Sequence, residues 1–247
     1  MCTIIGAIGA YPGLPAMLAG TRDEQLGRTA RPPFRWPTPQ IVAPRDERAG
    51  GTWMGASATG LLVALANRWV RVPDGGERSR GQLVVDMLAA DGLAHAEQTL
   101  ASTVEAETYD GFNLLVLDAD VGEGLYAEWD GTLRAERLDP GVYVMTNAGR
   151  DGQSYPQAPG LPDPAPRARV ADALGAEVRD ESTASGFTDR VRALLASHDP
   201  PVCLHRGDDV GTVSASVFRR TTDGVVTVEH TPGPPCTTAA RTLVEQL

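Results

Sequence analysis

Residues 1–9 read Met1-Cys2-Thr3-Ile4-Ile5-Gly6-Ala7-Ile8-Gly9. The apolar, β-branched run after Cys2 predicts a buried strand, which would hold that cysteine rigidly. Met1 is normally removed when a small residue such as cysteine follows it, and Cys2 would then carry both a thiol and a free α-amine. An amine with a reference pKa of about 7.7–8.0 can accept the proton of a thiol. Cys2 is therefore either a nucleophile with its own base or a small apolar residue that begins a core strand.

A charged motif follows the next predicted strand. A turn rich in proline and glycine separates the first strand from a second one at 16–22, which should run antiparallel to it. The far end of this second strand carries Thr21-Arg22-Asp23-Glu24. We therefore expect the motif to lie near Cys2, although a solvated turn would have the same composition.

The rest of the chain predicts strands and helices in blocks. Four segments have apolar residues at helical spacing: 80–90, 93–103, 167–178 and 187–197. Strands are predicted at 41–43, 49–55, 61–67, 112–117, 124–129, 133–138, 142–147, 210–219 and 225–230. A proline-rich loop is expected at 28–39 and a short helix at the C-terminus. This order predicts an α+β fold in one domain, residues 1–247, with two antiparallel sheets packed face to face and helices outside.

Composition excludes several classes of partner. The 247 residues include 32 Asp+Glu against 22 Lys+Arg, all of them arginine, and the net charge is −10. A surface this acidic argues against binding nucleic acid or an anionic membrane. No membrane span is expected, and three cysteines are too few for a disulfide scaffold, so a cytoplasmic location is predicted. The acidic, lysine-free composition also fits a saline cytoplasm, which predicts better folding in concentrated KCl.

The histidines and the two later cysteines carry little signal. Cys203-Leu204-His205 has two metal-ligand side chains, but no second pair follows at the spacing of a metal site, so no metal is predicted. His95 lies in a helical pattern, and His198 and His230 lie near the ends of elements. All three are expected to be structural or exposed.

A set of spaced motifs resembles the NRDE family, also called the transport and Golgi organisation 2 family. The motifs are Met1-Cys2, Thr21-Arg22-Asp23-Glu24, Ala49-Gly50-Gly51-Thr52-Trp53-Met54-Gly55, Ser79-Arg80-Gly81, Gly111-Phe112-Asn113-Leu114-Leu115, Pro140-Gly141-Val142-Tyr143 and Thr146-Asn147. They occur in the family's order over most of the chain. Two positions depart from the family pattern. Thr21 stands where the first letter of NRDE denotes Asn, and Val213 stands where many members carry Arg.

The sequence is more distantly similar to penicillin V acylases and bile salt hydrolases, which are N-terminal-nucleophile hydrolases of αββα sandwich fold. That resemblance implies catalytic roles for Arg22 and Asp23 beside Cys2, and for Asn67 and Asn147 at the oxyanion. Spacing leaves Glu24 as an alternative to Asp23. A further arginine of the acylases has no certain counterpart here, and Val213 lies near its expected place.

Physical chemistry is consistent with these roles. A nearby cation such as Arg22 lowers the pKa of a thiol and favours thiolate, and Asp23 could orient that arginine or the α-amine. Asn67 and Asn147 can donate side-chain N–H groups to an oxyanion, where one donor is typically worth about 2.7–4 kcal/mol. The same two asparagines could instead cap the ends of strands.

Two functions follow from the resemblance. The first is hydrolysis or transfer of a linear amide through Cys2, with a small-molecule substrate and no cofactor. The second is a haem-binding carrier on the same fold, because the close family is linked to haem trafficking and a cysteine thiolate can also ligate haem. Fold resemblance does not decide between them, and the substrate and oligomeric state are not readable from the sequence.

Overall fold

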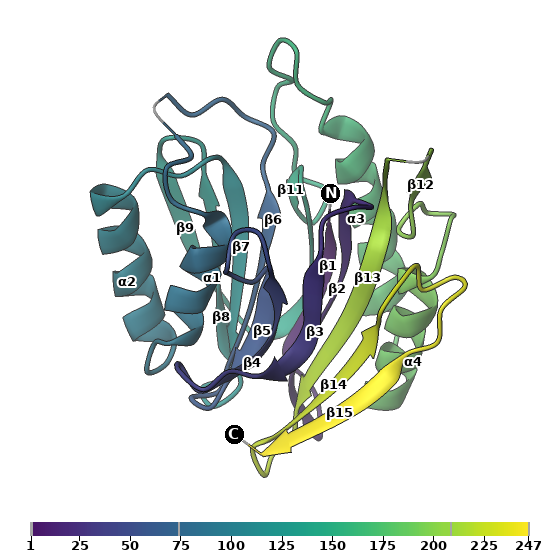
Figure 1. The fold of residues 1–247 in the computed structure, drawn as a ribbon. Coiled ribbons are helices and arrows are strands. Elements are labelled where there is room, and N and C mark those ends of the chain that lie inside the picture. The colour runs from purple at the N-terminus through teal and green to yellow at the C-terminus, as the bar shows by residue number, and fades with distance from the viewer. Residues whose placement is uncertain (1, 74, 208, 247) are drawn as a thin grey trace.

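The computed structural model describes residues 2–73, 75–207 and 209–246. Two antiparallel sheets pack against each other, and a pair of helices covers the outer face of each sheet (Figure 1). The predicted four-layer αββα sandwich is therefore confirmed. Among the described residues, no helix has the length and apolar character needed to cross a bilayer.

The first sheet contains both ends of the described chain. Its strand order is β11-β10-β1-β2-β13-β14-β15, and β12 pairs with β13. Its strands are β1 (Thr3–Tyr11), β2 (Leu14–Gln25), β10 (Gly141–Thr146), β11 (Gly149–Arg150), β12 (His205–Arg206), β13 (Val210–Arg220), β14 (Val225–Thr231) and β15 (Arg241–Gln246). Helices α3 (Ala165–Arg179) and α4 (Ala184–Leu195) cover its outer face.

The second sheet follows chain order from β3 to β9. Its strands are β3 (Ala30–Arg35), β4 (Ile41–Asp46), β5 (Met54–Ser57), β6 (Leu61–Asn67), β7 (Phe112–Asp118), β8 (Glu123–Trp129) and β9 (Leu133–Leu138). Helices α1 (Arg80–Leu88) and α2 (Leu93–Ala106) cover it. Ser79 caps α1 by accepting a hydrogen bond from the Gly81 N–H at 3.2 Å, and Thr183 caps α4 in the same way.

Continuous apolar runs form the central strands because both of their faces are buried. In β1, Ile4 and Ile8 pack between the two sheets, whereas Ile5 packs under α3 and α4. In β6, Leu62 faces the first sheet and Leu61 faces the helices of the second. The two-residue period of a strand thus places alternate side chains in different core layers.

Three local predictions were wrong, and two of them concern edge strands. The strand predicted at 49–55 begins only at Met54, and residues 49–53 are turn and loop. Residues 30–35 form β3 rather than a loop, and the register of the β3–β4 pair shifts between Arg31 and Phe34, around two prolines. Proline is tolerated at a sheet edge because its missing N–H breaks no interior ladder. The C-terminal segment forms β15 rather than a helix, because it pairs with β14 from His230 to Val225.

Candidate functional site

Cys2 lies immediately before β1, half-buried, and opposite the end of β10. The β1–β10 register pairs Thr3 with Thr146, so the next residues outward, Cys2 and Asn147, meet at the edge of the pairing. The backbone N–H of Cys2 donates to Asn147 Oδ1 at 3.2 Å. This nitrogen would become the α-amine if Met1 were removed. Asn147 therefore orients the group that is predicted to accept the thiol proton.

Asn147 also connects the two sheets. Its Nδ2 donates to the backbone carbonyl of Asn67, at the end of β6, at 2.6 Å. An amide nitrogen has two hydrogens, so one N–H is bonded to Asn67 and one is left for another acceptor. Asn67 is exposed, and it lines the same cleft as Cys2. The structure thus brings both predicted asparagines to the nucleophile, and their oxyanion role remains a prediction.

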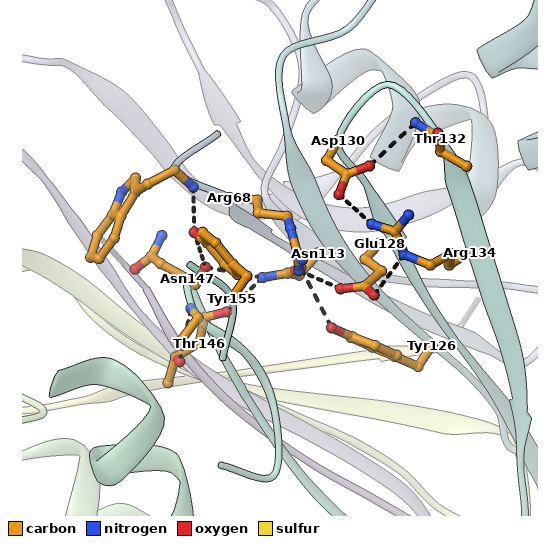
Figure 2. A network of polar contacts seen from close by, with 12 residues as sticks. Arg68, Asn113, Tyr126, Glu128, Asp130, Thr132, Arg134, Thr146, Asn147 and Tyr155 are labelled. Carbon is orange, nitrogen blue, oxygen red and sulfur yellow. Dashed lines mark hydrogen bonds and ion pairs between the residues drawn. The ribbon is translucent and has the colours of Figure 1, made fainter. Parts of the chain in front are cut away.

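A buried polar network positions Asn147, as Figure 2 shows. Asn113, the second residue of strand β7, is fully buried. Its Nδ2 donates to the carbonyls of Thr146 at 2.9 Å and Asn147 at 3.3 Å. Its Oδ1 accepts from Arg68 Nη1 at 3.1 Å and from the Tyr126 hydroxyl at 3.4 Å. Sequence reasoning did not assign Asn113 a role, although a lone polar residue in an apolar strand is a detectable signal.

Tyr155 completes this network on the other side of Asn147. Its hydroxyl donates to the Asn147 carbonyl at 3.0 Å and accepts from the Trp69 N–H at 2.7 Å. The Arg68 guanidinium lies 4.1 Å from the centre of the Tyr155 ring and forms an ion pair with Glu128. The carbonyl of Asn147 therefore has two donors, which restricts the backbone from which its side chain reaches Cys2.

Arg22 projects from β2 toward the second sheet. It is 5% exposed, and its Nη2 lies 2.7 Å from Asp46 Oδ2, at the end of β4. Its Nη1 donates to the Arg28 carbonyl at 3.2 Å, and its Cζ lies 4.5 Å from the centre of the Trp53 ring. Arg22 thus lines the cleft, and its positive charge is paired with Asp46.

Asp46 accepts hydrogen bonds from Arg22, from Arg28 and from the turn that follows β4. Its Oδ2 also accepts from Arg28 Nε at 2.8 Å, and its Oδ1 accepts from the Ala49 N–H at 2.9 Å. Burial would raise the pKa of this carboxyl, but the Ala49 hydrogen bond and the charges of Arg28 and Arg22 together lower it. Asp46 is therefore an ionised partner that holds Arg22 in place.

Asp23 projects to the opposite side of β2 from Arg22, because successive side chains alternate. It is buried, and its Oδ1 accepts from the Thr212 hydroxyl at 2.6 Å. The β2–β13 register shifts between Thr212 and Ser214, so Val213 occupies an irregularity directly across from the Arg22-Asp23 pair. Burial raises the pKa of Asp23, although the Thr212 hydrogen bond and the charge of Arg167 act against it.

Arg167 is a site residue that sequence reasoning missed. It lies at the start of α3, is 3% exposed and donates to the Pro201 carbonyl at 3.0 Å and to the Thr3 hydroxyl. Burial lowers its pKa, and the charges of Asp23 and Cys2 raise it. A signal existed in the sequence: Arg167 is in line with the apolar positions Val170, Ala171, Leu174 and Val178, which together form the buried stripe of α3.

The thiol of Cys2 is not poised as thiolate. Burial raises its pKa and the carboxyl of Asp23 adds to this, whereas the amino-terminal charge, a backbone hydrogen bond from Asp23 and the charge of Arg22 lower it without compensating. The predicted direction of the Arg22 effect is confirmed, because its charge lowers the pKa of the thiol. Desolvation of the charged form is the larger influence, so the net pKa is raised. Activation at neutral pH requires a base that accepts the proton during attack.

Cys2, Arg22, Asp23 and Asn67 line a cleft with a volume of about 480 Å³, whereas Asn147 and Arg167 lie buried behind its wall. Nine of the eighteen lining residues are charged, namely Arg22, Asp23, Glu24, Arg28, Asp46, Arg48, Arg78, Arg80 and Asp110. Arg80 donates to the Gly111 carbonyl at 2.9 Å and lies 3.8 Å from Asp110. The remaining lining includes Trp53 and Leu65 near the nucleophile. The cleft is suited to a polar ligand.

Close backbone packing explains two of the glycine motifs. A methyl group on Gly51 would lie 2.3 Å from the carbonyl carbon of Gly81. The Thr52 N–H donates to the Gly81 carbonyl at 3.1 Å. The segment that leads from Gly51 to Trp53 therefore packs directly on the start of α1, and together they form one wall of the cleft.

A second group of reactive side chains lies outside this cleft. Cys203 and His205, dismissed as a metal site for want of a second pair, lie beside His198 and Cys236. Their ligand atoms are all within 4.8 Å of one another. Sequence spacing could not show this, because Cys236 comes from the loop that follows β14.

Comparison with known proteins gives the family and the fold. The family described as Transport and Golgi organisation 2 matches residues 1–198. A Transport and Golgi organization protein 2 homolog from Bos taurus is 29% identical over 237 residues, which cover 85% of this chain and 84% of that protein. The Homo sapiens homolog is 31% identical over 142 residues, which cover 53% of this chain and 50% of that protein.

Two solved structures share the architecture. A mutant of the conjugated bile acid hydrolase from Clostridium perfringens aligns over 100% of this chain and 92% of its own, with a TM-score of 0.58 and 13% identity. The Caenorhabditis elegans N-acylethanolamine-hydrolyzing acid amidase ortholog aligns over 88% of this chain and 92% of its own, with a TM-score of 0.52 and 11% identity. At these identities the likeness establishes the fold. The match over residues 1–198 establishes that the chain belongs to the Transport and Golgi organisation 2 family.

Proposed function

We propose that this protein hydrolyses a linear amide through Cys2, after removal of Met1. The observation that carries the proposal is the hydrogen bond from the Cys2 backbone nitrogen to Asn147 Oδ1, at the edge of a polar cleft. An N-terminal nucleophile needs its amine held in a fixed orientation next to its own thiol. Asn147 supplies that orientation, and the buried Asn113 network restricts Asn147 in turn.

In the proposed reaction, the thiol proton of Cys2 passes to its own α-amine as the sulfur attacks the substrate. The sulfur forms a bond to the substrate carbonyl carbon, and the carbonyl oxygen takes up the negative charge next to Asn67 and the second N–H of Asn147. When the tetrahedral intermediate collapses, the carbon–nitrogen bond breaks and the ammonium of Cys2 protonates the leaving amine. Water, deprotonated by the same amine, then hydrolyses the thioester and regenerates the thiol.

The raised pKa of Cys2 fits this sequence of steps. Burial raises the pKa of this thiol and so disfavours the thiolate, and a nearby acceptor for the proton favours attack. The α-amine, with an ordinary pKa of about 7.7–8.0, is partly neutral at pH 7 and can accept the proton as attack proceeds. Proton transfer and nucleophilic attack are thus coupled within one residue.

The charged lining of the cleft limits the class of substrate. Half of the lining residues are charged, and Arg80 and Asp110 form a loose pair at 3.8 Å. Desolvating these groups under an apolar acyl chain would be costly. We therefore propose a small polar amide as substrate. A haem carrier that uses the Cys2 thiolate is the competing prediction, and the same sample can test both.

The test starts from the intact mass of the purified protein. In the form that lacks Met1, an electrophilic β-lactone probe should add one acyl group, and peptide mapping should place it on Cys2. Cys2→Ala should lose the adduct although Cys203 and Cys236 are still present. A form extended by residues before Cys2 should also lose it, because its amine is blocked.

Haem is then titrated into the same preparations. Acylation that survives in Cys2→Ala would contradict the hydrolase proposal. So would the absence of acylation together with a Soret shift that saturates at one haem per chain and disappears in Cys2→Ala. That second result would support the carrier.

A further inference from the structure

Four metal-ligand side chains converge around β12 of the first sheet. His198 follows α4, Cys203 precedes β12, His205 begins β12, and Cys236 lies in the loop between β14 and β15. Cys203 is buried, and Cys236 is partly buried. Two separate stretches of chain, 198–205 and the β14–β15 loop, therefore meet at this cluster, which lies outside the residues that line the candidate active-site cleft.

The separations match those of a tetrahedral zinc site. Zn–S bonds of about 2.3 Å and Zn–N bonds of about 2.0–2.1 Å place two sulfurs about 3.8 Å apart and a sulfur and a nitrogen about 3.6 Å apart. The observed Cys203 Sγ–Cys236 Sγ distance is 3.5 Å. His205 Nε2 lies 3.2 Å from Cys236 Sγ and 3.8 Å from Cys203 Sγ.

The histidine rings are oriented as in metal sites. His198 Nδ1 lies 2.8 Å from the Cys203 carbonyl. A carbonyl oxygen only accepts hydrogen bonds, so Nδ1 carries the proton and Nε2 keeps its lone pair for a metal. A ligating histidine typically donates its other ring N–H to a carbonyl in this way. The His205 ring presents Nε2 to both sulfurs.

We propose that Cys203, Cys236, His198 and His205 bind one zinc ion in a closed, structural Cys₂His₂ site. Two thiolates and two imidazoles are the donor set of tetrahedral structural zinc. Binding replaces the two thiol protons with a divalent cation, which leaves the site neutral. This proposal does not depend on the hydrolase activity.

A disulfide is the main alternative for the two cysteines. A Cys203–Cys236 bond would require the sulfurs to move from 3.5 Å to about 2.05 Å. It would leave the approach of two histidines unexplained, whereas zinc accounts for all four side chains.

Two hydrogen bonds through Thr212 connect the segment of the proposed zinc site to the candidate active site. The Leu204 N–H donates to Thr212 Oγ1 at 2.8 Å, and that hydroxyl donates to Asp23. Arg167 donates to the Pro201 carbonyl in the same segment. A metal that fixes the chain from 198 to 205 would therefore also position the groups around Asp23.

Metal analysis of the full chain tests the assignment. Protein purified without chelator, or reconstituted with ZnCl₂, should contain one zinc per chain, and cobalt substitution should give thiolate-to-cobalt charge-transfer and tetrahedral d–d bands. Cys236→Ser, in the partly buried loop, should bind zinc more than about 100-fold more weakly, since losing even an outer hydrogen-bond partner typically costs 10–100-fold. Cys2→Ser and His95→Ala should retain full zinc and serve as matched controls.

Three results would overturn the proposal. The first is wild-type protein that takes up no zinc and gives no cobalt charge-transfer band. The second is a Cys203→Ser/Cys236→Ser double variant that binds zinc as tightly as wild type. The third is protein kept under reducing conditions whose intact mass shows two hydrogens lost to a Cys203–Cys236 disulfide. Because cobalt binding is read on the wild-type chain, failure of a variant to fold would not prevent the test.

Discussion

Replacing Asn113 by leucine should destabilise the protein and disable the nucleophile together. The substitution removes four buried hydrogen bonds, two donated to the backbone at 146–147 and two accepted from Arg68 and Tyr126. A typical net contribution of about 1 kcal/mol per bond gives a loss of about 4 kcal/mol. For a chain of this size, that corresponds to a decrease in Tm of about 8–16 °C.

Urea denaturation followed by circular dichroism and tryptophan fluorescence would measure this loss, and coincident transitions would justify a two-state analysis. Tyr126→Phe is the matched control, because it removes only the 3.4 Å bond from the same Asn113 oxygen and should cost about 1 kcal/mol or less. Cys2 acylation by the β-lactone probe, measured well below the Tm, should fall in Asn113→Leu and persist in Tyr126→Phe. A loss of less than about 1 kcal/mol in Asn113→Leu, or equal losses in the two variants, would refute the reasoning.

Three further predictions concern the cleft. Asp23→Asn removes a charge that raises the pKa of Cys2, so the pH at which iodoacetamide alkylates Cys2 at half its maximal rate should fall below the wild-type value. Asp46→Asn should cost about 3 kcal/mol at neutral pH by leaving a buried arginine unpaired. Since the pKa of Asp46 is lowered on folding, wild type should lose this advantage as pH falls through that lowered pKa, which urea titrations across acidic pH would measure. Gly51→Ala should cost about 1–3 kcal/mol in thermal unfolding through overlap with α1, whereas Gly27→Ala, with no atom within 4 Å of the added methyl, should change stability by about 0.5 kcal/mol or less.

The sequence predicted the central strands well because their pattern is local. Every residue from Thr3 to Ile8 is buried, and the apolar runs at 61–67 and 112–117 likewise mark strands with both faces covered. The edges were harder, since β3 and β15 depend on the partner that each finds. A strand such as Arg241–Gln246 is defined by its pairing with β14 more than by its own composition.

In the candidate site, the residues in sequence motifs were predicted, and the residues that only tertiary packing brings together were not. Motif resemblance placed Asn147 with Cys2, and the β1–β10 register explains why they meet across 145 residues of sequence. Motifs did not indicate Arg167, whose relevance depends on how α3 packs over β10 and brings Arg167 to the Thr3 hydroxyl. Cys236 was missed for a similar reason, because only the path of the β14–β15 loop brings it to Cys203.

The raised pKa of Cys2 bears on how the site can work. Arg22 lowers the pKa of the thiol, but its guanidinium is paired with Asp46 at 2.7 Å, and its influence is smaller than that of burial. Burial therefore keeps the net pKa of the thiol raised. A cysteine in that state is inert until a base approaches it. In the proposed mechanism, only the α-amine of Cys2 is that base, so removal of Met1 would itself be the activating step.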